Sequence, residues 1–180
     1  MGKEMSGGRE IFCSLVIPCY NEGGNIAPLV KGFAEAVKTD DFELIIVDNG
    51  STDASAGILA ALAPGHAFLR VVSVPDNIGY GHGISQGLKA ARGRYAGWAH
   101  GDMQYSPAEI MNAVELLRPE RGEKIFLKGL RSARPFFETA FTSGMAVFES
   151  LLFGTLFRDI NAQPTLFHRS LLEDLSLIHI

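Results

Sequence analysis

One short polar segment carries three side chains that could hold a divalent metal ion. His100, Asp102 and Gln104 lie in the segment HGDMQ, directly after an apolar run. A hard cation bound to a diphosphate needs only one or two protein oxygens, because phosphate and water oxygens complete its shell. We therefore expect Asp102 to bind Mn²⁺ or Mg²⁺, with His100 and Gln104 beside it. Taken alone, the segment is explained as well by a turn in which Asp102 accepts backbone N–H groups.

A second acidic segment, DNGSTD, begins at Asp48 after the apolar run ELIIV. A turn followed by a helix N-cap at Asp53 accounts for the end of this segment. It accounts poorly for Asp48, because a carboxylate directly after a buried strand lies at the mouth of a sheet. There Asp48 could accept hydrogen bonds from a nucleobase or a ribose.

Two further segments could contact phosphate. Arg131 and Arg134 follow the run IFLK, and paired guanidinium groups match the oxygens of a phosphate. The segment GYGHGISQG begins at Gly79, and a glycine at a helix start allows close approach of a phosphate. Its spacing is not GxGxxG and no acidic residue follows at the expected distance, so it gives only weak support to a dinucleotide-binding oxidoreductase.

The elements that must position these residues alternate between strand and helix. Short runs rich in β-branched residues predict strands at 14–18, 43–47, 69–74, 95–99, 125–128 and 164–167. Apolar residues at helical spacing predict helices at 25–37, 53–62, 81–91, 106–117, 138–157 and from 170 onward. Ser106, Pro107 and Glu109 have the spacing of a capping box. This alternation predicts an α/β fold, a mostly parallel sheet of Rossmann type with helices on both faces.

In such a sheet, ligands bind beyond the carboxyl ends of the strands. A polar segment follows each of the first five predicted strands, at 19–22, 48–53, 75–83, 100–104 and 129–134. We expect these five segments to converge on one edge and to form a site.

Composition excludes several other classes of protein. The chain has 180 residues, 16 basic and 20 acidic, and its net charge of −4 argues against a nucleic-acid binder. Cys13 and Cys19 would lie about 20 Å apart at the two ends of one strand, too far for a disulfide. No run of 18 apolar residues predicts a membrane span. The apolar helix at 140–157 is expected in the core, with peripheral contact to a membrane as the alternative.

The segments VIPCYNEGGNI, IIVDNGSTD, DNIGYGHGISQGLKAARGRY and HGDMQYSP, in this order, resemble family 2 glycosyltransferases of the GT-A fold. The resemblance covers about residues 14–172 and includes bacterial polyprenyl-phosphate sugar synthases. It implies transfer of a sugar from a nucleoside-diphosphate sugar donor to a polyprenyl phosphate or glycan acceptor, with inversion and with a divalent metal ion. It also implies a cytoplasmic enzyme that works at the inner face of the plasma membrane.

The resemblance also implies roles for individual residues. The nucleotide would be bordered by Pro18, Tyr20, Asn21 and Glu22, and its base and ribose held by Asp48 and Asn49. Asp102 would bind the metal or the donor diphosphate, with Gln104 beside it. The diphosphate or an acceptor phosphate would face Arg131 and Arg169. Asp159 would be the base, needed if the acceptor is a hydroxyl group and not if it is a phosphate.

Two positions depart from the family pattern. His100 stands where the usual DAD triplet has a carboxylate, and imidazole is a better ligand for Mn²⁺ than for Mg²⁺. Asn49 stands where a second Asp is common. The HGD triplet leaves a catalytically inactive glycosyltransferase-like partner protein as an alternative, beside the Rossmann-type oxidoreductase.

We expect three regions along the chain. Residues 1–10 form a disordered lead, and residues 11–174 form the catalytic domain. Family members usually continue further, and LSLIHI at 175–180 resembles the translation of a sequencing-adapter end. The tail is therefore predicted to be non-native, and the domain to be truncated at its C-terminus.

Overall fold

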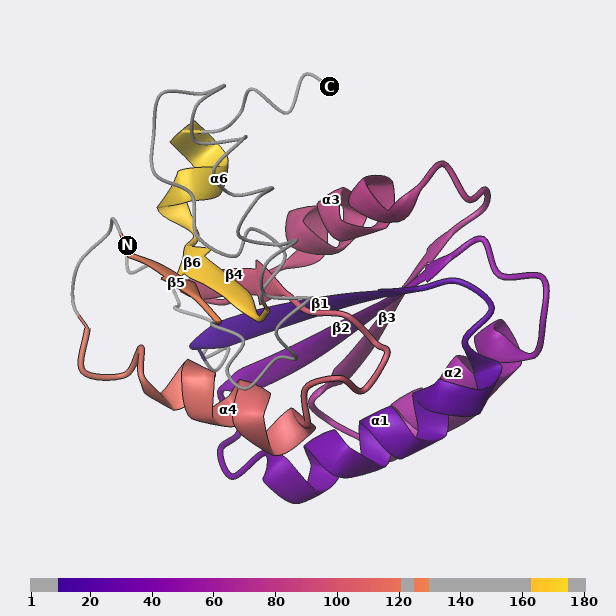
Figure 1. Cartoon of the computed structure of the whole chain (residues 1–180), viewed down its shortest axis with the longest axis horizontal. Helices are drawn as coiled ribbons and strands as arrows, with labels where there is room; N and C mark the ends of the chain where they lie inside the picture. Colours follow the sequence, from indigo (N-terminus) through magenta and orange to yellow (C-terminus); the bar gives the residue numbers. More distant parts are fainter. Residues whose placement is uncertain (1–9, 121–124, 130–162, 175–180) are drawn as a thin grey trace, which may run out of the picture.

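The strands form a single mixed sheet in the computed structural model, which describes residues 10–120, 125–129 and 163–174 (Figure 1). The strands are β1 (Cys13–Cys19), β2 (Phe42–Asn49), β3 (Leu69–Val74), β4 (Tyr95–Trp98), β5 (Phe126–Lys128) and β6 (Thr165–His168). Their order across the sheet is β3-β2-β1-β4-β6-β5. β1 pairs in parallel with β2 and β4, and β2 pairs in parallel with β3. The predicted α/β fold with a mostly parallel sheet is confirmed.

The interior strands β1 and β2 are buried along their whole length, as their apolar sequences predict. Every residue of β1 and β2 is buried, because helices cover both faces of the sheet. Cys13 and Cys19 lie at the two ends of β1 as free, buried thiols, which confirms that they are not bridged. Burial raises the pKa of both thiols, to about 12 for Cys19, so neither is a thiolate at neutral pH.

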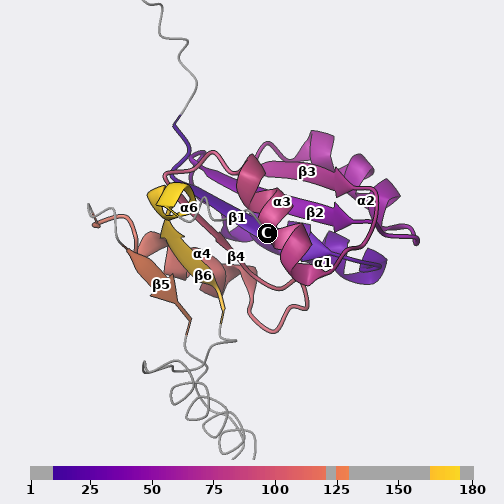
Figure 2. The ribbon, with the colours of Figure 1, turned by 90° about the horizontal axis from the view of Figure 1, so that it is seen from above.

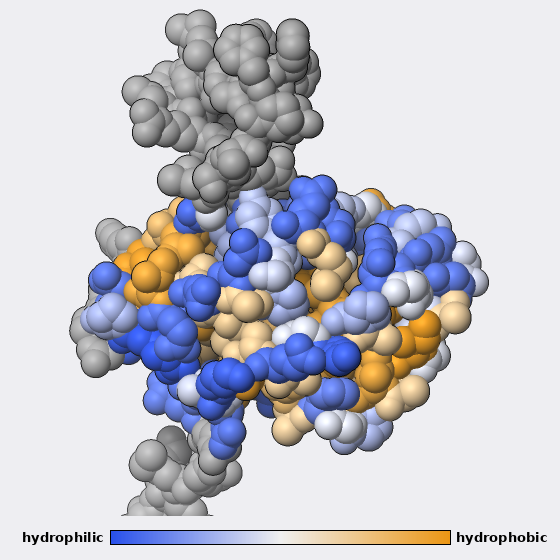
Figure 3. Space-filling model, turned by 60° about the horizontal axis from the view of Figure 1, so that its bottom comes forward, coloured by the Kyte–Doolittle hydropathy of each residue, from blue (hydrophilic) through white to orange (hydrophobic). Residues whose placement is uncertain are grey.

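Helices cover the sheet in two layers. α1 (Gly23–Ala36), α2 (Ser55–Leu62) and α4 (Pro107–Glu115) lie over one face (Figures 1 and 2). α3 (Tyr80–Ala90) and α6 (Ser170–Asp174) lie over the other, and a 3-10 turn at Ala63–Gly65 follows α2. Each layer encloses its own hydrophobic core against the sheet. None of the helices in the described ranges is long and apolar enough to cross a bilayer. On the face that α1, α2 and α4 turn outward, hydrophilic residues surround smaller hydrophobic areas (Figure 3).

The start of α4 is set by local sequence, as predicted. The Ser106 hydroxyl accepts from the Glu109 N–H at 3.2 Å, and the Glu109 carboxylate accepts from the Ser106 N–H at 2.8 Å. These two bonds make a capping box, with Pro107 in the first turn of the helix.

The predicted N-cap at Asp53 is wrong. α2 begins at Ser55, after Ala54 in the cap position. Asp53 instead accepts from the Ser55 N–H at 2.9 Å and from the Gly23 N–H at 3.2 Å. Its carboxylate therefore ties the start of α2 to the start of α1, and the hydrogen bonds from Ser55 lower its pKa.

The last strand, β6, departs from the parallel arrangement of β1 to β4. β6 runs antiparallel to both of its neighbours, and it lies between β4 and β5. The amino end of β6 therefore lies at the edge where the parallel strands have their carboxyl ends. Arg169, which follows β6, lies at the opposite edge. The predicted helix at 138–157 and the predicted tail at 175–180 lie outside the described residues.

Candidate functional site

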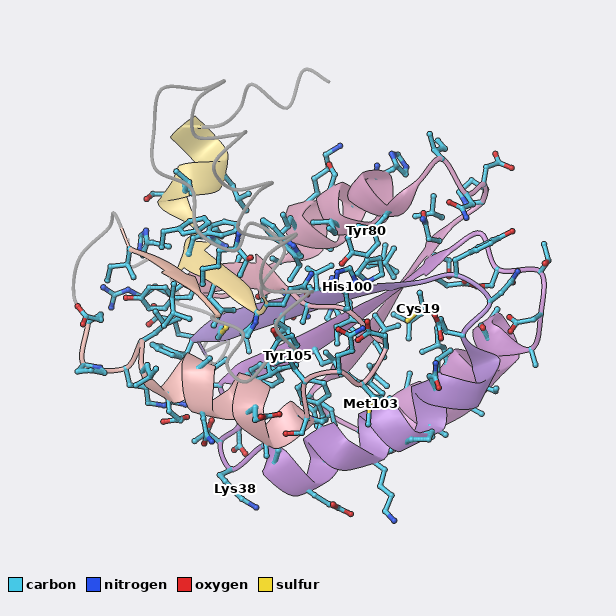
Figure 4. The ribbon with its side chains drawn as sticks, in the orientation of Figure 1. Cys19, Lys38, Tyr80, His100, Met103 and Tyr105 are labelled. Atoms are coloured by element: carbon cyan, nitrogen blue, oxygen red, sulfur yellow. The ribbon has the colours of Figure 1, made fainter. Side chains whose placement is uncertain are left out.

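A pocket of about 400 Å³ opens at the carboxyl ends of β1, β2 and β4. Its walls come from the last residues of β1 and β2, from the first residue of α3 and from the segments that follow β1, β3 and β4. They consist of Pro18, Cys19, Tyr20, Glu22, Asn49, Asn77, Tyr80, His100, Gly101 and Asp102. Figure 4 labels Cys19 of β1, Tyr80 of α3 and His100 in the segment after β4, with Lys38 beyond the carboxyl end of α1. The predicted convergence of polar segments on one edge is confirmed for the first four segments.

The segment after β1 is held in place by the segment after β2. The Asn21 side-chain oxygen accepts from the Thr52 N–H at 2.8 Å and from the Asp53 N–H at 3.3 Å. The Ser51 hydroxyl accepts from the Asn21 N–H at 3.0 Å, and the Ser55 hydroxyl from the Glu22 N–H at 3.0 Å. Asn21 itself has a φ of 55°, a left-handed conformation that Asn tolerates better than most residues. The acidic segment DNGSTD thus fixes the wall of the pocket that Tyr20 and Glu22 form.

The end of β2 places the amide of Asn49 in the wall of the pocket, whereas Asp48, the residue before it, is not part of that wall. Asp48 is buried, and its Oδ1 accepts from the Ser51 N–H at 3.0 Å. Gly50 makes the turn between them with a φ of 75°, a conformation that favours glycine. A side chain at Gly50 would also collide with the backbone of Asn77, so the segments after β2 and β3 pack directly on one another.

Asn49 has an unused acceptor in the pocket wall. Its Nδ2 donates to the Asn77 Oδ1 at 3.2 Å and to the Gly79 carbonyl at 3.1 Å. Its Oδ1 is buried and has no hydrogen-bond partner among the described residues. An orphaned buried acceptor is costly unless a ligand or a water supplies a donor. Asn49 is therefore poised to accept a hydrogen bond from a hydroxyl or an N–H group of a ligand.

The segment after β4 presents an aromatic pair and a carboxylate. The His100 ring stacks on the Tyr80 ring, with centroids 4.8 Å apart and planes at 20°. Asp102 is exposed at the pocket, and its Oδ1 accepts from the Gln104 N–H at 3.1 Å. Met103, which lies between Asp102 and Gln104, has a φ of 61°, a left-handed conformation that costs energy in a residue with a long side chain. This strained turn aims Asp102 at the pocket.

Gln163, just before β6, reaches the same pair. It is 5% exposed, and its side chain hydrogen-bonds the Tyr80 phenol. The Gln163 Oε1 has no partner within the described part of the chain, so its NH₂ group is the donor to Tyr80. Burial raises the pKa of Tyr80, and the Asp102 carboxylate adds to the rise against the opposing effect of Gln163. Tyr80 is therefore a neutral phenol at physiological pH.

The metal-ligating side chains in the pocket suit a cation for which the protein supplies only some of the ligands. In the described ranges, no group of three or more His, Cys, Asp and Glu side chains is placed to enclose a metal ion. Asp102 and His100 stand in one segment beside open space. One carboxylate with one imidazole fits a divalent ion whose other ligands are phosphate and water oxygens. Gln104 is exposed and is not part of the pocket wall.

Several predicted residues do not join this pocket. Gly79 lies beside it and contributes its carbonyl to Asn49 and its N–H to Asn77. Arg169 lies at the opposite edge of the sheet, where it bonds to Arg92 and Arg94, because β6 is antiparallel. Arg131 and Asp159 lie outside the described residues.

Sequence reasoning did not single out the other residues of the site. Cys19, Asn77, Tyr80 and Gln163 line the pocket or contact its walls. The aromatic residue in the segment after the third strand, at a predicted helix start, is the signal that could have pointed to Tyr80.

Comparisons with known proteins show which proteins the chain is similar to. The chain is 38% identical over 125 residues to a dodecaprenyl-phosphate galacturonate synthase of Rhizobium johnstonii (67% of this chain, 36% of that protein). It is 38% identical over 110 residues to an undecaprenyl-phosphate 4-deoxy-4-formamido-L-arabinose transferase of Edwardsiella ictaluri (58% and 33%). It thus spans about a third of the length of these relatives.

A solved structure with the same fold is the mannosyltransferase PcManGT of Pyrobaculum calidifontis, in complex with GDP-Man and Mn²⁺. It matches with a TM-score of 0.68 and 22% identity, over 92% of this chain and 47% of that one. The family model described as glycosyl transferase family 2 matches residues 14–148. The pocket, the sheet order and this match lead to one assignment: the chain belongs to glycosyl transferase family 2.

Proposed function

We propose that this protein transfers a sugar from a nucleoside-diphosphate sugar to the phosphate of a polyprenyl phosphate. The observation that carries the proposal is the pocket at the carboxyl ends of β1, β2 and β4, which combines an orphaned acceptor on Asn49 with the exposed carboxylate of Asp102. The names of the two relatives, both polyprenyl-phosphate enzymes, support this acceptor class. A glycan acceptor is the alternative within the same family.

In this proposal the nucleoside lies at the end of β2, against the segment after β1. Asn49 Oδ1 accepts a hydrogen bond from the base or the ribose, and Asp48 orders the turn beneath it. Pro18, Tyr20 and Glu22 form the neighbouring wall of the pocket. Asn21 supports that wall through its bonds to Thr52 and Asp53 and does not need to touch the ligand.

The diphosphate lies at the end of β4. Asp102 would hold a divalent ion there, with His100 as a second ligand and Gln104 beside it. Such an ion stabilises the charge that develops on the leaving diphosphate. The complex of PcManGT with GDP-Man and Mn²⁺ supports a divalent ion in a neighbour of the same fold.

Two further residues complete the proposal from outside the described ranges. Arg131 follows β5 closely along the chain and is proposed to face the diphosphate. Asp159 is proposed on the acceptor side, where a base is needed only for a hydroxyl acceptor. A phosphate acceptor is already anionic, so with polyprenyl phosphate Asp159 would orient the acceptor. We also propose that the enzyme works at the inner face of the plasma membrane, where both substrates meet.

The test is a transfer assay with radiolabelled UDP- and GDP-sugars, Mn²⁺ and undecaprenyl phosphate in detergent micelles. We expect label to enter the organic phase with the wild type, and to do so at least about a hundredfold more slowly with Asp102→Asn, as for loss of one group that stabilises the transition state. Glu35→Gln is the matched control, because Glu35 is an exposed carboxylate on α1 that pairs along the helix with Lys31 and lies outside the pocket wall. Equal rates for the two variants would refute the site. Donor binding without transfer to any lipid phosphate would refute the acceptor.

A further inference from the structure

The His100 side chain has one aromatic neighbour and, within the described ranges, no hydrogen-bond partner. Its ring lies in the wall of the pocket at the carboxyl ends and stacks on the Tyr80 ring, with centroids 4.8 Å apart and planes at 20° (Figure 4). A stack of this kind covers the face of an imidazole, whereas both ring nitrogens lie on its edge. The nitrogens of His100 are therefore available to a ligand in the pocket.

The backbone that carries His100 is held against β1. Beyond the end of β4, the Ala99 N–H donates to the Val16 carbonyl of β1 at 3.0 Å. Gly101 follows His100, and a Cβ added there would lie 3.2 Å from the Ile17 side chain. The chain on both sides of His100 thus lies directly on β1. Only the side-chain torsion angles of His100 are left to set the direction of its ring.

Tyr80 is held both by the backbone before it and by its phenol. It is the first residue of α3 and directly follows Gly79. The Gly79 N–H donates to the Asn77 Oδ1 at 3.0 Å, and the Gly79 carbonyl accepts from the Asn49 Nδ2 at 3.1 Å. At the other end of the side chain, the buried amide of Gln163 bonds the phenol. A ring tethered at both ends is a preorganised platform, which holds a second ring stacked on it in one plane.

The Asp102 carboxylate borders the same space as the two rings. His100 and Asp102 are two positions apart, so their Cα atoms are at most about 7 Å apart. Both residues line the pocket, as Tyr80 does. The Asp102 carboxylate lies close enough to the Tyr80 phenol to contribute to the rise in its pKa. An imidazole edge and a carboxylate therefore face one pocket, beside the ring that sets the plane of the imidazole.

A nitrogen ligand distinguishes between divalent ions. Mg²⁺ takes oxygen ligands, and imidazole is a better ligand for Mn²⁺ than for Mg²⁺. Most metal-binding histidines donate their other ring N–H to a carboxylate or a carbonyl, and that bond orients the ring. No described residue makes such a bond to His100. The stack on Tyr80 is therefore the contact that orients this imidazole.

We propose that Tyr80 is a positioning residue, whose stack on His100 holds the imidazole as a nitrogen ligand of the divalent ion and so makes the site prefer Mn²⁺ to Mg²⁺. The inference rests on the proposed function, in which Asp102 holds the same ion. Tyr80 itself needs no contact with the ion. Its effect passes through the ring of His100, the residue that replaces a carboxylate of the usual triplet.

The experiment is pulsed electron paramagnetic resonance of Mn²⁺ bound to the full chain, with ¹⁵N in its histidines alone. UDP and GDP are each added in turn, and the label separates a histidine ligand from the nitrogens of the nucleotide base. We expect a ¹⁵N hyperfine coupling to Mn²⁺ in the wild type. The coupling should vanish in His100→Asn. It should persist in the control His82→Gln, because His82 lies on α3 outside the pocket wall.

Variants of Tyr80 test the positioning role. Tyr80→Leu should lose most of the ¹⁵N coupling, whereas Tyr80→Phe keeps the ring and should keep the coupling. Mg²⁺ should displace half of the bound Mn²⁺ at a concentration roughly two- to tenfold lower in Tyr80→Leu than in the wild type, the worth of one aromatic pair. Gly83→Ala disturbs the pocket wall at Pro18 and Asn49 instead, and the Mn²⁺ that it binds should keep the coupling.

The outcomes separate this inference from the proposed function. An unchanged ¹⁵N coupling in Tyr80→Leu, or an unchanged competition by Mg²⁺, overturns the inference. Mn²⁺ bound to the wild type without a ¹⁵N coupling also overturns it and leaves the proposed function standing. Failure of the folded wild type to bind Mn²⁺ with either nucleotide refutes the proposed function and the inference together. If circular dichroism shows that Tyr80→Leu is unfolded, Tyr80→Ala replaces it, because alanine favours a helix and carries no ring.

Discussion

Three glycines of α3 give a graded test of how closely this helix packs on the sheet. A Cβ added at Gly81 would meet nothing within 4 Å. At Gly83 it would lie 2.9 Å from the Pro18 Cβ and 3.2 Å from the Asn49 side chain. At Gly87 it would collide with the Val16 side chain and lie 2.9 Å from Val47. The same substitution, Gly→Ala, therefore meets open space, the pocket wall and the core in turn.

The magnitudes follow from two opposing effects. Ala in place of Gly inside a helix gains roughly 0.5–1 kcal/mol. Overpacking of a close contact costs about 1–3 kcal/mol. Gly81→Ala should therefore raise the free energy of unfolding by up to ~1 kcal/mol. Gly83→Ala should lower it by about 1 kcal/mol and Gly87→Ala by about 2 kcal/mol.

The variants should also separate stability from binding. The atoms nearest to a Cβ at Gly83 belong to Pro18 and Asn49, two residues of the pocket wall, whereas those nearest to a Cβ at Gly87 belong to the core residues Val16 and Val47. Gly83→Ala should weaken binding of the nucleotide-sugar donor, while Gly87→Ala should leave it close to wild type in protein that is still folded. Urea denaturation and calorimetric titration measure the two effects. Equal stability of all three variants would refute the packing of α3, and unchanged donor binding in Gly83→Ala would refute the position of the pocket.

Three further predictions concern an ion pair, a helix cap and the aromatic pair. Arg118 binds both oxygens of Asp41, at 2.9 and 3.0 Å, and lowers the pKa of Asp41 from 3.8 to about 2. The pair's contribution to the free energy of unfolding is complete above pH 4 and is lost as the pH falls to 2. Because both side chains are partly exposed to solvent, this contribution is about 1 kcal/mol. Arg118→Met should therefore remove about that much of the dependence of the free energy of unfolding on acid pH. Ser106→Ala should lower the free energy of unfolding by about 1 kcal/mol, while Ser106→Thr should keep most of it, as measured in urea. Tyr80→Leu should weaken donor binding by roughly two- to tenfold through loss of the stack on His100, and Tyr80→Phe should preserve binding; equal calorimetric affinities would count against the stack.

The sequence predicted those elements whose signal is local. β1 and β2 were predicted to within two residues at each end, because both are apolar on both faces and polar segments bound them. α4 was predicted from its capping box, which needs only residues three positions apart. The start of α2 was misplaced, because the Asp53 carboxylate has a distant partner, Gly23, that no local pattern reveals.

The site was predictable to the extent that it follows from the ends of parallel strands. Asp48 and Asp102 were expected together because each follows a strand of a parallel sheet, and the structure places Asp102 and the neighbouring Asn49 in the pocket wall but not Asp48. Arg169 was misplaced because the direction of β6 depends on pairing with β4, which four residues of strand sequence do not encode. Gln163 was missed for the same reason, since the antiparallel direction of β6 is what brings it to Tyr80.

Calorimetric titration of UDP- and GDP-sugars, with Mn²⁺ or with EDTA, is the most direct test of the donor pocket. The wild type should bind one nucleotide class in a metal-dependent manner. Asp102→Asn should lose the metal dependence, while Glu35→Gln should bind as the wild type does. Failure of the folded wild type to bind any nucleotide sugar, or binding by Asp102→Asn that still requires Mn²⁺, would contradict the account.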